Sequence, residues 1–159
     1  NFYNNDDYIS HYAKLGADYI GVHRRTFDNI NEMEKAIVKI IALKKKPGIF
    51  LEIDEDFDYE LSSLVLKYNI KWIVFMGVPI GYGGQFFNKT IIPKIRNTLN
   101  FLKKNKHKVK IEVDGGLTTE VIDQLNAVGV DYFAGWSIVK GRNLNEISLK
   151  LDNLKKYFS

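Results

Sequence analysis

The sequence predicts an α/β fold with parallel strands, and three observations lead to this prediction. Short β-branched and aromatic runs alternate five times with segments whose apolar residues recur at helical spacing. The peptides LGADYIGV (15–22) and VGVDYFAG (128–135) each place a glycine where a helix ends and Asp-Tyr where a strand begins. Three of the five strand ends are rich in glycine. Such repeats form either an open doubly wound sheet or a closed (β/α)8 barrel, and periodicity alone does not choose between them.

The elements follow one another in strand–helix pairs. In the first pair, ADYIGVH is a β-branched and aromatic run, and Met33, Ile37, Ile40 and Ile41 recur at helical spacing after it. The same change of period recurs along the rest of the chain. Strands are expected at 17–23, 48–54, 71–78, 108–116 and 131–139, and helices at 30–46, 59–69, 89–105, 119–129 and 146–158.

Length and composition are typical of a single globular domain over residues 1–159. The chain is 45% hydrophobic and 13% aromatic, which is enough to bury a core. It has no cysteine, which excludes disulfides, thiolate metal sites and a thiol nucleophile. The net charge of +4 comes mostly from lysine runs without interleaved aromatic residues, so nucleic-acid binding is not expected. Neither a spanning run of about 20 apolar residues nor a leader is evident, so we expect no membrane contact and a cytoplasmic location.

The C-terminal ends of the strands are where function collects in parallel α/β folds. Glycines at such ends allow backbone N–H groups to approach an anion closely. The five ends are His23-Arg24-Arg25, Glu52 to Asp56, the loop 81–84, Asp114-Gly115-Gly116 and Gly135-Trp136-Ser137. The glycine-rich ends therefore predict a phosphate site, although each alone is also consistent with an ordinary turn.

Asp114 is the residue most indicative of chemistry. It follows VKIEV, which is typical of a buried strand, and precedes two glycines, so its carboxylate is expected at the mouth of the sheet as a base or a metal ligand. A turn or helix-capping role is the alternative. His23 ends its strand in a similar way and is interpreted as a hydrogen-bonded support, with a ligand role as the alternative. His11, on a helix, and His107, in a lysine-rich loop, are not expected to be catalytic.

These motifs resemble a known family. VFMGVPIGYGGQFFNKTIIPKI, followed by IEVDGG and FAGWSIV, is similar to the last three strands of the ribulose-phosphate 3-epimerase family, and KLGADYIGVH is similar to its fourth strand. The resemblance implies a (β/α)8 TIM barrel of the ribulose-phosphate-binding type, of which this chain holds strands four to eight. It also implies that GYGGQFF covers the phosphate of a sugar phosphate.

The resemblance implies a reaction as well. Family members interconvert D-ribulose 5-phosphate and D-xylulose 5-phosphate with two aspartates around a divalent metal ion (Zn, Fe, Mn or Co). The second aspartate matches Asp114, as base and metal ligand, and the first aspartate and the other ligands are expected upstream of Asn1. The isolated strand edges need a covering partner, and a homo-oligomer is expected. The residues implied to surround the phosphate are Gly83, Gly84, Gly115, Gly116, Gly135, Trp136 and Ser137.

The sequence departs from the family pattern at several positions. Ile80 replaces a loop proline, Arg25 replaces an acid, Ile53 replaces a proline and Trp136 replaces a serine. The indole of Trp136 is expected to crowd the phosphate. The alternative is therefore a non-catalytic family member that binds a phosphosugar or a protein partner. Another enzyme of the same barrel group, such as a hexulose-phosphate synthase, is less favoured by GYGGQFF.

Overall fold

The computed structural model describes residues 5–141 and 143–155, and its centre is a parallel sheet of five strands. The strands lie in the order of the chain, each paired in parallel with the next. This confirms the parallel α/β prediction, and it excludes the doubly wound alternative because such a sheet reverses its strand order. The strands are β1 (Tyr19–His23), β2 (Lys46–Leu51), β3 (Trp72–Met76), β4 (Lys110–Asp114) and β5 (Tyr132–Ala134).

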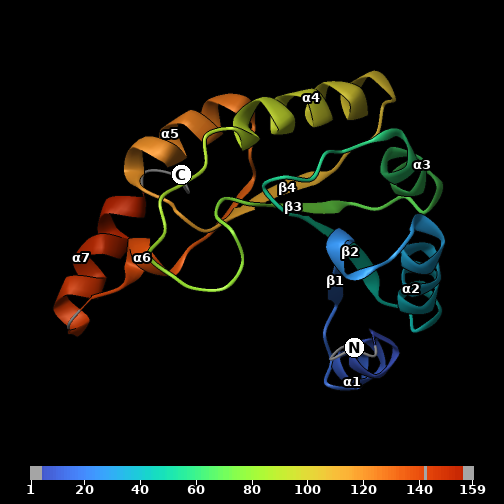
Figure 1. Ribbon diagram of the computed structural model, residues 1–159. Helices are drawn as coiled ribbons and strands as arrows, with labels where there is room; N and C mark the ends of the chain where they lie inside the picture. Colours follow the sequence, from blue (N-terminus) through green and yellow to red (C-terminus); the bar gives the residue numbers. More distant parts are fainter. Residues whose placement is uncertain (1–4, 142, 156–159) are drawn as a thin grey trace.

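Helices connect consecutive strands and cover one face of the sheet (Figure 1). Polar caps fix several of their starts: the Asn29, Asp58 and Thr118 side chains accept hydrogen bonds from the amides three residues later. None of the described helices is long and apolar enough to cross a membrane. The helices are α1 (Asn5–Lys14), α2 (Ile30–Ala42), α3 (Tyr59–Lys67), α4 (Ile91–Lys104), α5 (Thr119–Val128), α6 (Trp136–Val139) and α7 (Leu144–Leu154), with a 3-10 turn η1 at Arg24–Thr26.

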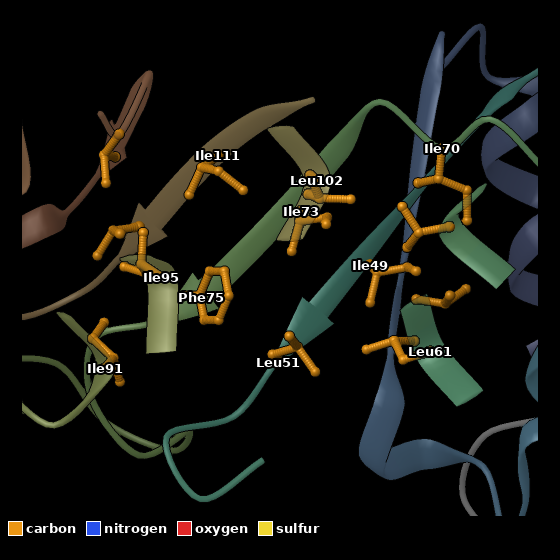
Figure 2. Packing of buried hydrophobic residues seen from close by; sticks show 14 of the residues in the cluster. Ile49, Leu51, Leu61, Ile70, Ile73, Phe75, Ile91, Ile95, Leu102 and Ile111 are labelled. Carbon is orange, nitrogen blue, oxygen red and sulfur yellow. The ribbon is translucent and has the colours of Figure 1, made fainter. Parts of the chain in front are cut away.

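The two faces of the sheet differ in character because side chains alternate along each strand. On the helix-covered face, residues such as Ile49, Ile73 and Phe75 are fully buried against α3 and α4 (Figure 2). The opposite face, which we call the inner face, carries rings and carboxylates. There the Trp72 ring contacts Phe50 at a centroid distance of 5.4 Å. Its Nε1–H donates to Glu112 Oε2 at 2.8 Å. The Glu112 carboxylate and its ring partner therefore lie on the inner face.

Several element boundaries differ from the sequence prediction. The helix expected at 30–46 ends at Ala42, because Lys44 adopts a left-handed φ of 58° and β2 begins at Lys46. The strand expected at 131–139 ends at Ala134, and Trp136–Val139 is helix α6, which begins after Gly135. The helix expected at 146–158 begins at Leu144, and its last predicted residues lie outside the described ones. The glycine predicted to end a helix before residue 130 does so, since Gly129 has φ 101°.

Candidate functional site

The ends of β3 and β4 meet at a cavity of about 310 Å³, which we call the glycine cavity. The long loop between β3 and α4 runs out beyond the sheet toward α6 (Figure 1). The lining of the glycine cavity includes Asp114, Ile80 and, among the residues predicted to surround phosphate, Gly83, Gly84, Gly115, Gly116 and Trp136. Residues from three separate strand ends are thus brought together.

One predicted phosphate residue, Gly135, lies outside this cavity, and another cannot be placed. Gly135 precedes α6 and lines a smaller apolar cavity of about 130 Å³ instead. The prediction for the Ser137 hydroxyl lies outside the described side chains. Trp136 does line the glycine cavity, but 69% of its surface is exposed, so the indole extends largely into solvent. The expected crowding by this ring is therefore limited.

Close backbone packing explains why glycine occupies the end of β4. Gly116 has φ +69°, and a Cβ there would lie 2.7 Å from the Cα and 2.8 Å from the nitrogen of Phe87. At Gly115, with φ +96°, a Cβ would lie 2.6 Å from Val78 Cγ2. Only glycine fits both positions without a shift of the backbone or the neighbouring valine.

The amides near the glycine cavity are not equally available to a ligand. The Gly115 N–H donates to the Ala134 carbonyl at 2.8 Å, which ties β4 to β5 and removes that amide as a donor. Within the described residues, no acceptor takes the amides of Gly83, Gly84 or Gly116. These three N–H groups are therefore available to an anion.

The loop is held closed by hydrogen bonds that sequence reasoning missed. The Gln85 side-chain Nε2 donates to the carbonyls of Pro79 at 2.7 Å and Tyr82 at 2.8 Å. At the neck of the loop, the Asn88 N–H donates to the Gly77 carbonyl at 2.8 Å. The loop backbone is therefore ordered before any ligand arrives, which lowers the entropy cost of binding.

Asp114 lies where the sequence predicted, at the end of β4, with its carboxylate half-buried in the glycine cavity. Burial raises the pKa of Asp114 above its ordinary range, and the nearby His23 acts in the opposite direction. A carboxylate whose pKa is raised toward neutrality is a stronger base than an exposed one.

The inner face also holds a pair of side chains that the sequence did not reveal. His23 Nδ1 lies 3.3 Å from Glu52 Oε1, and Glu52 is only 4% exposed. Burial raises the pKa of Glu52, while the hydrogen bond with His23 opposes that rise. The hydrogen bond predicted for His23 is present, and its role stays a prediction. The one hint in the sequence was that both residues stand at strand ends.

A second inner-face carboxylate, Glu112, leads to a prediction on stability. Burial raises the pKa of Glu112 above 4.5. The stability that this carboxyl group contributes is therefore fully present below pH 4.5 and is lost as the pH rises through the higher pKa of the folded state. Glu112→Gln keeps an acceptor for Trp72 without the charge. We expect it to raise Tm by about 2 °C at pH 7, a small effect because solvent screens this half-exposed group.

Thermal melts at pH 7 and pH 4 check this expectation. The gain from Glu112→Gln should fade at pH 4, where the native carboxyl is also neutral. Glu34→Gln is the matched control of opposite sign, because the hydrogen bond from Lys67 lowers the pKa of Glu34. A lower Tm for Glu112→Gln at pH 7 would contradict the expectation.

The described residues do not supply a full ligand set for a metal ion. Asp114 offers one carboxylate, but within 5–141 and 143–155 no three His, Asp or Glu side chains gather in a way that could hold a metal. The metal site predicted at Asp114 therefore stays a prediction, and the residues present do not by themselves fit it.

Known proteins resemble this chain in both sequence and fold. The model of the ribulose-phosphate 3 epimerase family matches residues 2–140. A ribulose-phosphate 3-epimerase of Serratia marcescens is 27% identical over 86% of this chain and 62% of its own length. One of Buchnera aphidicola subsp. Baizongia pistaciae is 32% identical over 80% of this chain and 54% of its own length. The chain thus spans a little over half the length of these curated relatives.

Solved structures share the arrangement of strands and helices. KGPDC from Streptococcus mutans has a TM-score of 0.65 at 18% identity, over 99% of this chain and 69% of that one. A 3-hexulose-6-phosphate synthase has a TM-score of 0.63 at 14% identity, over 96% of this chain and 68% of that one. The fold is therefore that of the ribulose-phosphate-binding barrel enzymes over about 70% of their chains. Because the family model matches most residues of this chain, the chain belongs to the ribulose-phosphate 3 epimerase family.

Proposed function

We propose that this chain carries the Asp114 side of an epimerase site that interconverts D-ribulose 5-phosphate and D-xylulose 5-phosphate. The observation that carries the proposal is that the half-buried Asp114 carboxylate and the glycine loop line one cavity. Because the chain spans a little over half the length of its relatives, we assign this activity to the intact protein.

Each part of the glycine cavity has a role in this proposal. The free amides of Gly83, Gly84 and Gly116 hold the phosphate, which fixes the distance of the carbon chain from Asp114. The carboxylate removes the proton at C3, next to the ketone, and the electron pair moves into an enediolate. A second acid on the opposite face, which the family resemblance places upstream of Asn1, returns a proton to C3 and gives the epimer. The raised pKa of Asp114 favours its action as this base.

The reaction is tested by incubating the intact protein with ribulose 5-phosphate in D₂O. We expect xylulose 5-phosphate to form with deuterium at C3, because the proton on the catalytic group exchanges with solvent. Product without deuterium at C3 would contradict proton transfer there. Binding of the sugar phosphate without turnover would favour the non-catalytic alternative.

The phosphate contacts are tested by adding a methyl group to the loop. At Gly83 a Cβ meets nothing within 4 Å and the backbone needs no left-handed conformation, whereas Gly84 has φ +84°. We expect Gly83→Ala to weaken binding of inorganic phosphate about tenfold, the equivalent of one lost hydrogen bond, without lowering Tm. Gly84→Ala should weaken binding as much and should also lower Tm, because of its backbone strain.

Calorimetric titration and thermal melts of the two variants separate these effects. Trp136→Ser is the control, since it removes a largely exposed side chain of the same cavity and leaves the loop glycines unchanged. It should bind phosphate at least as well as the parent. If Gly83→Ala and Gly84→Ala both bind like the parent, the loop is a structural turn.

A further inference from the structure

The pair formed by His23 and Glu52 is fixed in place more firmly than a surface contact requires. Glu52 follows β2 directly and is 4% exposed, and its carboxylate lies 3.3 Å from His23 Nδ1. The imidazole also stacks on Phe50, with a centroid distance of 4.6 Å and an interplanar angle of 29°. These contacts use one nitrogen and one face of the ring. The Nε2 edge makes no hydrogen bond within the described residues, and the side chain is 32% exposed.

Two other pairs of charges near these strand ends have partners of their own. The Arg25 guanidinium binds Asp54, and Lys94 Nζ lies 2.9 Å from Asp56 Oδ1. Glu55 Oε2 accepts the N–H of Glu52. The Glu52 side chain is therefore left to His23. A buried carboxylate lowers stability unless a partner compensates it, and such pairs cluster at functional sites.

The pair opens onto a space that reaches the glycine loop. His23 and Glu52 line a cavity of about 580 Å³, which we call the histidine cavity. Ile80 of the loop also lines it, and the same residue lines the glycine cavity. The charge of His23 acts on Asp114, which stands on the far side of β2 and β3. Both cavities have the size of small-molecule sites, and one loop borders both.

We propose that His23, held by Glu52, is a further substrate-contacting residue, which donates from Nε2 to an oxygen of the sugar's carbon chain while the glycine loop holds the phosphate. Donation from both ring nitrogens uses the doubly protonated ring, and Glu52 is its positioning residue, because it accepts from Nδ1–H and fixes the orientation of the ring. A donor aimed at an oxygen that gains charge in the enediolate stabilises the transition state more than the ground state. The inference rests on the proposed function, because it assumes a sugar phosphate in the glycine cavity.

A binding experiment tests the contact without relying on turnover. The intact protein, isotope-labelled, is titrated with inorganic phosphate and then with ribulose 5-phosphate, while the histidine ring and glycine amide signals are followed by NMR. His11→Gln and His107→Gln assign the other two rings. We expect the Gly83 and Gly84 amides to move with both ligands and the His23 ring to move only with the sugar phosphate.

The outcomes separate the inference from the proposed function. Movement of the glycine amides without any movement of the His23 ring overturns the inference alone. If no signal moves with either ligand, the proposed function falls, and the inference falls with it.

Kinetics then distinguish a positioning role from a merely structural one. We expect His23→Gln to lower kcat about 10²-fold, as for loss of a transition-state donor. Glu52→Gln should lower kcat about tenfold, as for a weakened bond to a charged group, with the affinity for inorganic phosphate unchanged. Its Tm at pH 7 should not fall, because burial disfavours the charged carboxylate that the amide replaces.

Glu112→Gln is the matched control, because it neutralises a carboxylate of the same inner face whose partner is Trp72. Its kcat should stay within about twofold of the parent. The positioning role is overturned if Glu52→Gln keeps the parental kcat, or if its loss of activity follows a loss of Tm.

Discussion

Replacing Asp114 with asparagine is expected to reduce epimerisation by the intact protein at least about 10³-fold, the largest functional effect we predict. The amide has the shape of the carboxylate but cannot accept the C3 proton. Asp114 is half-buried, and its pKa is raised by burial, so the native group is suited to take that proton near neutral pH. The loss should appear in kcat, because the phosphate contacts are separate from the carboxylate.

Matched measurements show whether the loss is chemical. Asp123→Asn makes the same change at an exposed position of α5 and should leave the rate unchanged. The affinity of Asp114→Asn for inorganic phosphate should equal that of the parent or exceed it, because a negative charge leaves the cavity. Retention of more than about a tenth of the activity would rule out Asp114 as the base.

Gly116→Ala is expected to cause the largest loss of stability among the glycine variants, about 2 kcal/mol or more, or roughly 4–8 °C in Tm. The added Cβ would meet two backbone atoms of Phe87, at 2.7 Å and 2.8 Å. Backbone cannot yield as a flexible side chain can, and φ +69° is itself unfavourable for alanine. The loop that begins after β3 must move away from β4, so phosphate affinity should fall as well.

Gly83→Ala serves as the reference for this loss. It adds the same methyl group to the same cavity wall where nothing lies within 4 Å, so its Tm should stay close to that of the parent. Thermal melts of the two variants give the comparison directly. If Gly116→Ala has the same Tm as Gly83→Ala, Phe87 does not approach Gly116 as described.

Much of the fold could be predicted from the sequence because its signals are local. The change from period two to helical period located all five strands, and Gly129 ended α5 as its position indicated. The errors arose where local signals were ambiguous. The segment Trp136–Val139 has the apolar and β-branched residues typical of a strand, but it forms helix α6, which begins after Gly135. The lysines after Ala42 are compatible with a longer helix, so the sequence did not show where α2 ends. The left-handed backbone of Lys44 excludes its continuation.

The candidate site was predictable only in part. Asp114 and the glycines were indicated because they follow the predicted strands, and strand ends of a parallel sheet meet at one edge. The pairing of His23 with Glu52 was not predictable, because 29 residues separate them and the contact depends on strand register. The hydrogen bond from the Gly115 N–H to the Ala134 carbonyl depends on strand register in the same way. Composition could not reveal either contact.

The strand order has a consequence for how the protein is made. Each strand of the described sheet pairs only with the strands before and after it in the chain. A strand that leaves the ribosome therefore finds its partner already synthesised, and no early strand of this sheet has to wait for a distant one. Such nearest-neighbour growth avoids the slow closure of long loops and limits the time that an unpaired edge stays exposed during synthesis.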